Sequence, residues 1–363
     1  MVAAAAQPRG LAVSDELEFY SIDPRENPTE AAEVRLLLAQ CDLDMEAGIE
    51  TFVLGRAGRR LVACAGLEHN IVKCVATAEE YRGESLSLKL MSEIIHLAQE
   101  RGHHHLFLYT HPKNVSFFEG CGFYELAEVP GYVSLMENTP VGINGYCRRL
   151  ATQRHNGLKI GCIVMNANPF TFGHQYLVRL AASQCDWLHL FVVREDVSLF
   201  SYRDRFALVQ RGVADIPRLT LHHGSEYMVS RATFPDYFFK EKGMVGACCT
   251  AIDLLLFRNY IAPALGVTHR FVGTEPFCAT TRKYNDDMKF WLQSAPSEAA
   301  PVVVMEVPRS QCAGVPISAS KVRRLLRSGN VAHIAELVPR DTLELLRGKY
   351  AFAQSAEAGG VGA

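Results

Sequence analysis

Residues 159–183 read KIGCIVMNANPFTFGHQYLVRLAAS, and the rest of the chain is organised around them. An apolar run over 160–165 is followed by a polar turn and then by the tetrapeptide TFGH (171–174), which begins a helical pattern. This order predicts a strand, a tight loop and a helix N-terminus. The free N–H groups at such a terminus favour bound phosphate. Gly173 allows a ligand to approach the main chain, and His174 is placed to donate to phosphate oxygens.

A second predicted helix start lies far downstream, at ISASKVR (317–323). Its hydroxyl groups and arginine could meet the same polyphosphate. Together the two segments resemble the nucleotidylyltransferase superfamily, whose motifs are (His/Thr)-x-Gly-His and Ile-Ser-x-(Ser/Thr)-x-x-Arg. Thr171 to His174 match the first motif, and Ile317 to Arg323 match the second. Taken alone, the Gly-His pair is equally consistent with an ordinary helix start that carries a solvated histidine.

The composition limits the class of protein. With 363 residues, 48% of them hydrophobic, the chain is long enough for two domains with separate cores. Its 37 basic and 39 acidic residues give a net charge of −2, so charge gives no reason to expect nucleic acid or an anionic membrane as a partner. No apolar run approaches the roughly 20 residues of a spanning helix, and no signal-peptide pattern is present. These features predict a soluble, cytoplasmic protein.

No metal site is predicted from the cysteines or histidines. The 11 cysteines show no CxxC spacing and are expected to be reduced thiols. Three consecutive histidines occur at 103–105. Neighbouring side chains on a strand face alternate sides, so the three cannot share one ligand face.

The first half of the chain has a different order of elements. The expected elements are a strand at 17–21, a helix at 31–41, two or three hairpin strands across 51–77, a helix after Ser85, a strand at 105–110, a helical turn at 114–119 and a strand from 121. This order resembles the GNAT acetyltransferase fold. RGESLS (82–87) aligns with that family's pyrophosphate loop, Arg/Gln-x-x-Gly-x-Gly/Ala. The family's later Phe-Tyr-x-x-x-Gly-Phe region aligns with Phe117, Phe118, Gly122 and Phe123.

The pyrophosphate loop departs from the family pattern. Ser85 and Ser87 stand where the family has small Gly or Ala, so the main chain would approach a pyrophosphate less closely. Two interpretations of the first half stay open. It is a binding platform that holds a coenzyme-A-like arm through Arg82, Gly83, Ser85 and Ser87, or it is a scaffold that has lost catalysis.

These patterns predict an α/β protein with two domains. A GNAT-like α+β domain is expected at 15–138 and a Rossmann-like nucleotidylyltransferase domain at 157–350. A linker is expected at 139–156, and disordered tails at 1–14 and 351–363.

The second domain is predicted to contain a parallel sheet in a doubly wound arrangement. Its strands are expected at 160–165, 187–193, 219–222, 269–272 and 302–307, separated by helical patterns. Ligands of such sheets bind at the carboxyl ends of the strands. Both phosphate motifs and Gly273-Thr274-Glu275 fall there.

The long loop segments of the second half resemble those of the citrate lyase ligase family. The matching segments are IVMNANPFTFGH (163–174), 186–193, 198–206, SRATFPDYFFK (230–240), HRFVGTEPF (269–277) and 317–323. The resemblance extends from about Leu17 to Leu346.

The resemblance implies an ATP-dependent, AMP-forming ligase. Acetate and ATP would form acetyl-adenylate and release pyrophosphate. The acetyl group would then pass to the thiol of a coenzyme-A-like arm on the acyl carrier subunit of citrate lyase. Mg²⁺ would bridge the triphosphate oxygens. Such chemistry needs alignment and charge neutralisation rather than a protein nucleophile.

The resemblance also implies roles for particular residues. The expected catalytic residues are Thr171, His174, Lys240 and Arg323. The expected ATP-binding residues are Asn166, Asn168, Pro169, Phe170, Gly173, Arg203, Gly273, Glu275, Ser318 and Ser320.

Two other functions stay open at this point. A plain nucleotidylyltransferase would adenylylate a phosphorylated cofactor precursor and ignore acetate. Alternatively, the first domain would be an acetyl-coenzyme-A-dependent acetyltransferase and the second a nucleotide sensor. A purely structural role would leave the two phosphate motifs unexplained.

Overall fold

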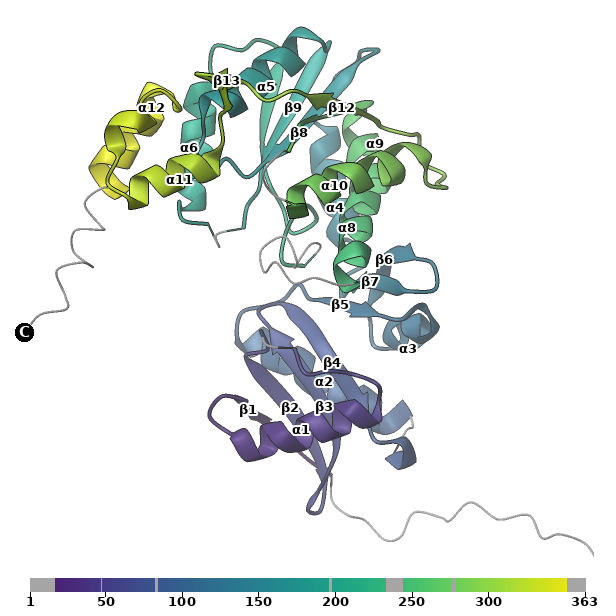
Figure 1. Cartoon of the computed structure of the whole chain (residues 1–363). Helices are drawn as coiled ribbons and strands as arrows, with labels where there is room; N and C mark the ends of the chain where they lie inside the picture. The colour runs from purple at the N-terminus through teal and green to yellow at the C-terminus, as the bar shows by residue number, and fades with distance from the viewer. Residues whose placement is uncertain are drawn as a thin grey trace, which may run out of the picture. The chain divides into compact units, whose positions relative to one another are not determined.

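The computed structural model describes residues 17–46, 48–81, 84–195, 198–232, 244–275 and 279–350 (Figure 1). These residues form two compact units. The first comprises the described residues up to Glu125 together with Val133–Pro140, and the second comprises Leu126–Tyr132 together with those from Val141. The predicted tails, Arg82, Gly83, Lys240 and Phe277 lie outside the described residues.

The first sheet, with its helices, follows the order predicted for the GNAT fold. Its elements are β1 (Leu17–Ile22), α1 (Pro28–Gln40), β2 (Thr51–Ala57), β3 (Arg60–Glu68), β4 (Ile71–Thr77), η1 (Glu79–Tyr81), α2 (Glu84–Glu100), β5 (Phe107–Thr110), η2 (Pro112–Asn114), α3 (Val115–Gly120), β6 (Tyr124–Val129) and β7 (Val133–Glu137). Helix α1 begins at Pro28, earlier than predicted, because a proline at the first helical positions has no N–H to leave unpaired.

The seven-stranded sheet has the order β1-β2-β3-β4-β5-β7-β6, and its strands β1 to β5 and β7 belong to the first unit. Strands β4 and β5 are parallel, with Ile71 opposite Phe107 and Val72 opposite Leu108, whereas β1 to β4 pair antiparallel in sequence. Helix α2 buries Leu86, Leu90, Ile94 and Ala98 in the core of this unit. Their spacing of four residues places one apolar stripe on the helix, which was predicted to follow Ser85.

The stretch 139–156, predicted as a linker, contains helix α4 (Gly142–Ala151). This helix belongs to the second unit and buries Ile143 and Leu150. The two buried positions are seven residues apart, so the apolar stripe has only one residue for every two turns. That sparse pattern explains why the sequence suggested a connection rather than a helix.

The second unit alternates strands and helices after α4. Its elements are β8 (Ile160–Met165), α5 (Phe172–Ser183), β9 (Trp187–Val192), α6 (Tyr202–Gly212), β10 (Leu219–His223), α8 (Met244–Leu256), η3 (Phe257–Ile261), α9 (Ala262–Leu265), β11 (His269–Gly273), α10 (Ala279–Lys289), η4 (Phe290–Ser294), β12 (Val303–Val307), β13 (Gln311–Cys312), β14 (Val315–Pro316), α11 (Ala319–Arg327), η5 (Val331–Ile334), α12 (Arg340–Leu345) and η6 (Leu346–Tyr350).

Five of these strands form a parallel sheet in the order β10-β9-β8-β11-β12. All five were predicted, and the α/β fold class with its parallel sheet is confirmed. Helices α5 and α6 lie on one side of the sheet and α8, α9 and α10 on the other (Figure 1). The strand order reverses between β8 and β11. In doubly wound sheets the ligand crevice opens at this switch point.

One helical stretch of the second unit, Cys248–Leu265, is long and apolar enough to cross a membrane by composition alone. However, 72% of it is buried within the protein. Core helices of soluble proteins have the same property, and Leu254, Leu256 and Ile261 are almost completely enclosed.

Candidate functional site

The loop after β8 ends in a capped helix start. Thr171 is the N-cap of α5, and its Oγ1 accepts the N–H of His174 at 3.4 Å. In return, Nδ1 of His174 accepts the backbone N–H of Thr171 at 3.1 Å. Threonine supplies the hydroxyl that such a cap needs, and histidine takes the place of the usual Glu or Gln. These two contacts hold the backbone of the TFGH tetrapeptide in the conformation of a capped helix start.

The same contacts fix the protonation of His174. A backbone N–H can only donate, so Nδ1 must accept, and the neutral ring carries its proton on Nε2. Burial lowers the pKa of His174 to about 4, and the cationic Arg309 nearby contributes to the shift. At neutral pH His174 is therefore a neutral side chain with an N–H donor at Nε2.

The two predicted phosphate motifs lie against each other. A Cβ atom added at Gly173 would come within 3.4 Å of the carbonyl oxygen of Ile317 and within 3.6 Å of its Cβ. A side chain at this position would therefore be in van der Waals contact with the second motif. Residues 171–174 and 317–323, far apart in the sequence, therefore form one surface at the carboxyl end of the sheet.

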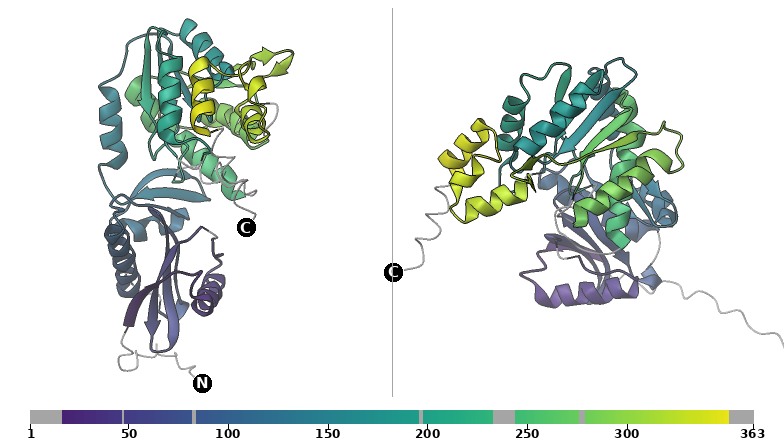
Figure 2. Two further views of the ribbon diagram at one scale, coloured as in Figure 1. Left: turned by 90° about the vertical axis from the view of Figure 1, so that its left-hand side faces the viewer. Right: turned by 45° about the horizontal axis from the view of Figure 1, so that its top comes forward.

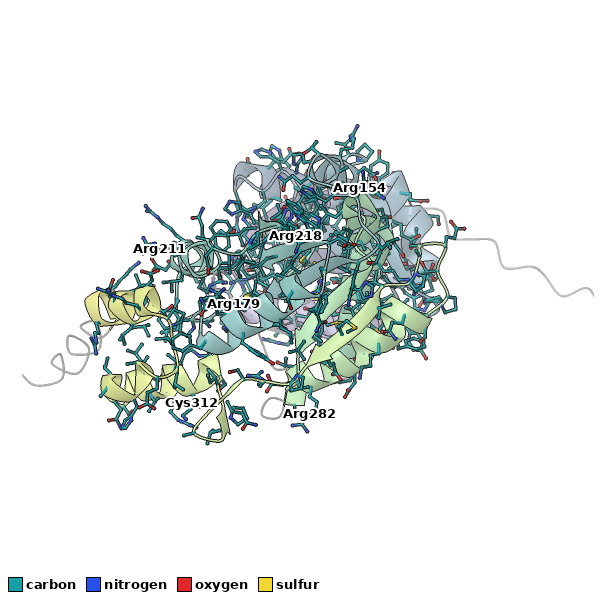
Figure 3. All side chains as sticks on the ribbon, turned by 90° about the horizontal axis from the view of Figure 1, so that it is seen from above. Arg154, Arg179, Arg211, Arg218, Arg282 and Cys312 are labelled. Carbon is teal, nitrogen blue, oxygen red and sulfur yellow. The ribbon has the colours of Figure 1, made fainter. Side chains whose placement is uncertain are left out.

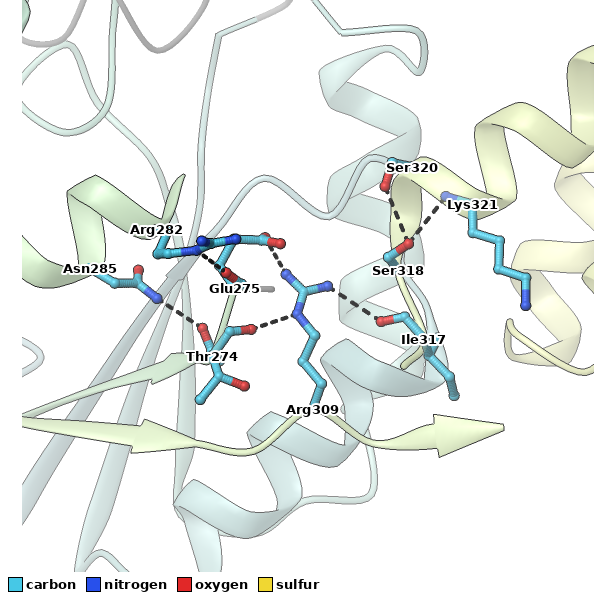
Figure 4. Close-up of polar contacts among 10 residues, drawn as sticks. Thr274, Glu275, Arg282, Asn285, Arg309, Ile317, Ser318, Ser320 and Lys321 are labelled. Atoms are coloured by element: carbon cyan, nitrogen blue, oxygen red, sulfur yellow. Dashed lines mark hydrogen bonds and ion pairs between the residues drawn. The ribbon is translucent and has the colours of Figure 1, made fainter. Parts of the chain in front are cut away.

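The second motif begins a helix in the way the first does. Ser318 is the N-cap of α11, and its Oγ accepts the N–H of Lys321 at 3.2 Å. Ser320 is exposed, with its Oγ 3.2 Å from that of Ser318 (Figure 4). Arg323, one turn further on, donates to the carbonyl oxygen of Asn168 at 2.5 Å. Arg323 thus ties the second motif to the loop that carries the first.

The loop after β11 lies on the other side of the switch point from the loop after β8. Nothing lies within 4 Å of the position that a Cβ of Gly273 would occupy, so the main chain there faces open space. The Gly273 carbonyl oxygen accepts the side-chain N–H of Asn285 at 3.0 Å. The side chain of Glu275 is 7% exposed and forms an ion pair with Arg309.

Arg309 is a residue of this site that no sequence motif indicated. Its Nε donates to the carbonyl oxygen of Thr274 at 2.6 Å, and another guanidinium nitrogen donates to that of Ile317 at 3.4 Å (Figure 4). Together with the Glu275 pair, these bonds join the β11 loop to the second motif. Arg309 lies two residues beyond the end of β12, so the rule that ligands bind at the carboxyl ends of strands would have drawn attention to it.

Arg205 was not predicted as a site residue either. Its buried side chain holds the loop after β8 in place through hydrogen bonds. It is fully buried and donates to the carbonyl oxygens of Phe200, Val193 and Glu195. It also donates to the backbone and side-chain oxygens of Asn166, both at 2.8 Å. A buried guanidinium whose donors are satisfied in this way holds several loop segments in one arrangement.

The other predicted ATP-binding residues have different surroundings. Phe170 is completely buried, packs against Gly212 and stacks on His174 with 5.8 Å between ring centroids, so it supports the histidine from the core. Pro169 is also buried and follows a cis peptide bond. Arg203 is exposed and lines a groove on α6 together with Lys349 of η6.

The predicted arm-binding loop is only partly described. Ser85 is exposed, whereas Ser87 is half-buried with its Oγ 3.4 Å from the Oγ1 of Thr77. Their contact with an arm stays a prediction.

The arrangement suits a polyphosphate. One surface carries several hydrogen-bond donors that could bind phosphate oxygens. They are the N-termini of α5 and α11, the Nε2–H of His174, the hydroxyls of Ser318 and Ser320 and the guanidinium of Arg323. Within the described ranges, no group of three or more His, Cys, Asp or Glu is placed to hold a metal ion. A Mg²⁺ ion that is coordinated mainly by phosphate oxygens does not require such a group.

Comparisons with known proteins agree on both halves of the chain. The family described as Citrate lyase ligase C-terminal domain matches residues 160–346, and the Acetyltransferase (GNAT) family matches residues 15–123.

Similar proteins cover most of the chain. The citrate (pro-3S)-lyase ligase of Escherichia coli is 51% identical over 330 residues, which are 91% of this chain and 94% of that protein. The corresponding ligase of Klebsiella pneumoniae is 52% identical over 309 residues, 85% of this chain and 90% of that protein. Among solved structures, Escherichia coli ElaA overlaps 34% of this chain over 100% of its own length, with 18% identity and a TM-score of 0.31.

Proposed function

Because the chain belongs to the citrate lyase ligase family and is therefore an enzyme of the ligase class, we propose that it activates acetate with ATP and acetylates the acyl carrier subunit of citrate lyase. The contact between Gly173 and Ile317 carries the mechanistic part of the proposal. It joins two helix starts that are rich in hydrogen-bond donors into one surface. A triphosphate site requires many donors in one place, whereas a protein that binds no nucleotide has no need of them.

The proposed reaction has two steps. In the first, a carboxylate oxygen of acetate attacks the α-phosphorus of ATP, the bond to the β-phosphate oxygen breaks, and acetyl-adenylate and pyrophosphate form. In the second, the thiol of the carrier's coenzyme-A-like arm attacks the acetyl carbonyl carbon, loses its proton, and AMP leaves. Neither step requires a covalent bond to the protein, so the enzyme contributes alignment and charge stabilisation.

Each motif has a part in the first step. His174 donates from Nε2 to a phosphate oxygen, while Thr171 holds the imidazole ring in place. Ser318, Ser320 and the N-terminus of α11 donate to the leaving pyrophosphate, and Arg323 adds positive charge beside it. Donors that are already fixed in position stabilise developing negative charge at little reorganisation cost.

The loop after β11 is the proposed place of the adenine ring. The open space beside Gly273 admits a flat ring next to the main chain, and Glu275 is held at its edge by Arg309. Mg²⁺ would be coordinated chiefly by the triphosphate and would neutralise part of its charge.

We also infer a cytoplasmic location. ATP is a cytoplasmic substrate, and all the cysteines of the described residues are free thiols.

The first prediction concerns His174. Acetate-dependent exchange of radioactive pyrophosphate into ATP should occur without the carrier, and His174→Ala should lower its rate by about a hundredfold, because one fixed donor to the charged transition state is lost. His333→Ala, at an exposed histidine of the same unit, is the matched control and should leave the rate unchanged.

Two outcomes would reject the proposal. Exchange that ignores acetate but requires a phosphorylated acceptor would indicate a plain nucleotidylyltransferase. Full exchange in the His174 variant would remove the first motif from the reaction.

A further inference from the structure

A cationic groove runs along α6 in the second unit, separate from the motif surface. It has a volume of about 350 Å³ and is lined by Arg203, Arg211 and Lys349. Helices α6 and α12 lie side by side at this place (Figures 1 and 2). Seen from above, Arg211 projects near the C-terminal helices (Figure 3).

The positive charge of the groove is not balanced within the described part of the chain. Asp204 is the one carboxylate among its described lining residues, and it is already engaged. It forms an ion pair with Lys349 at 2.6 Å and accepts the hydroxyl of Ser201 at 2.9 Å. No described carboxylate pairs with Arg203 or Arg211. Two guanidinium groups are therefore available for an external anion, and their planar forks suit carboxylates.

The shape of the groove indicates the kind of anion. Arg203, Ala207 and Arg211 are four residues apart and lie on one face of α6, so the two arginines start about 12 Å apart. The floor between them is apolar, formed by Ala207, Leu208 and Leu345. A ligand matched to this surface carries two anionic groups about two helical turns apart, with apolar groups between them.

We propose that the groove docks an acidic amphipathic helix of the protein substrate. Carboxylates seven or eight residues apart on a helix are separated by about 10–12 Å, which matches the two arginines. The apolar residues between them would cover the floor. The inference rests on the proposed function, because that function makes a carrier protein the acyl acceptor.

The position of α6 makes such docking productive. The helix begins next to Phe200, whose N–H donates to the side-chain oxygen of Asn168 at 3.4 Å. Its 11 residues extend for about 16 Å from there. A carrier held on α6 is therefore within about one helix length of the loop that leads into the first motif, a distance that a flexible arm can span.

Arg211→Glu tests the inference. The substitution should raise the KM for the carrier subunit about tenfold or more at low salt, with kcat and carrier-independent ATP–pyrophosphate exchange unchanged. Arg211→Lys keeps the charge and should raise this KM much less. Arg327→Glu is the matched control, because Arg327 also lies in the last turn of its helix but does not line the groove. Salt should raise the KM of the wild type more than that of Arg211→Glu.

Different results would reject the proposed function and the proposed docking groove. If wild type shows no acetate-dependent exchange, the proposed function is wrong. If wild type exchanges and acetylates the carrier, but Arg211→Glu has the same KM for the carrier as Arg327→Glu, the groove does not dock the carrier.

Discussion

The positive charge of Arg309 acts on His174 in the candidate site. The histidine is neutral because burial and the neighbouring guanidinium both lower its pKa, to about 4. Arg309 is itself held by Glu275 and by two backbone carbonyl groups. The arginine therefore joins two loops and adds to the effect of burial, which keeps His174 neutral.

Replacing Arg309 should change the titration of His174. In Arg309→Met the pKa of His174 should rise towards its usual value, because one positive neighbour is gone while burial remains. Arg309→Lys keeps the charge and should give a smaller rise. The pKa can be measured by an NMR titration that follows the chemical shifts of the imidazole carbons of His174 as the pH is changed. An unchanged pKa in both variants would show that burial alone sets it.

At the scale of elements, the site depends on helix caps. Thr171, Ser201 and Ser318 cap α5, α6 and α11, and each accepts an N–H from the first turn of its helix. The caps fix where each helix begins, and therefore where its free N–H groups point.

Ser318→Ala should separate capping from ligand contact. Loss of the cap should lower the free energy of unfolding by about 1 kcal/mol. Ser201→Ala removes a comparable cap and serves as the control. If Ser318 also donates to phosphate, its alanine variant should lose about tenfold or more in exchange rate, while Ser201→Ala loses little. Equal exchange rates in the two variants would restrict Ser318 to capping. Urea unfolding and pyrophosphate exchange give the two measurements.

At the scale of the whole molecule, buried histidines connect stability to pH. Nδ1 of His189 lies 2.9 Å from Nε2 of His222, on neighbouring strands of the parallel sheet. Burial, with His222 next to it, lowers the pKa of His189 to about 3, and burial lowers the pKa of His222 to about 4. Nε2 of His189 has no hydrogen-bond partner among the described residues, so protonation there would leave a buried charge without support.

Stability should therefore fall as the pH decreases below about 6.5. Above that pH both histidines are neutral in the folded and unfolded chains, and they add no pH dependence. Below it the unfolded chain binds protons that the folded chain does not, at a cost of at most about 2 kcal/mol for each histidine at pH 5. Urea unfolding at pH 8, 6.5 and 5 measures the loss. His222→Gln should reduce it, whereas His333→Gln, at an exposed position, should not. A loss that is identical in all three proteins would exclude the buried pair as its cause.

The sequence by itself determined the family of this protein and the strands of its parallel sheet. The five strands of the parallel sheet were predicted within one residue at each end, because short apolar runs between helical patterns are a local signal. The two predicted phosphate motifs could also be recognised locally, since each is a contiguous segment that starts a helix. Their residue types also carried the resemblance to the citrate lyase ligases.

Only the tertiary structure decided which residues act together. Arg309 and Arg205 have no motif of their own, and their roles arise from carbonyl and carboxylate groups that other segments bring to them. Arg203, whose contact with ATP stays a prediction, lies on a groove that Lys349 from the far end of the chain also lines. Burial, pKa shifts and charge balance depend on distances in space between such segments, and sequence order does not contain those distances.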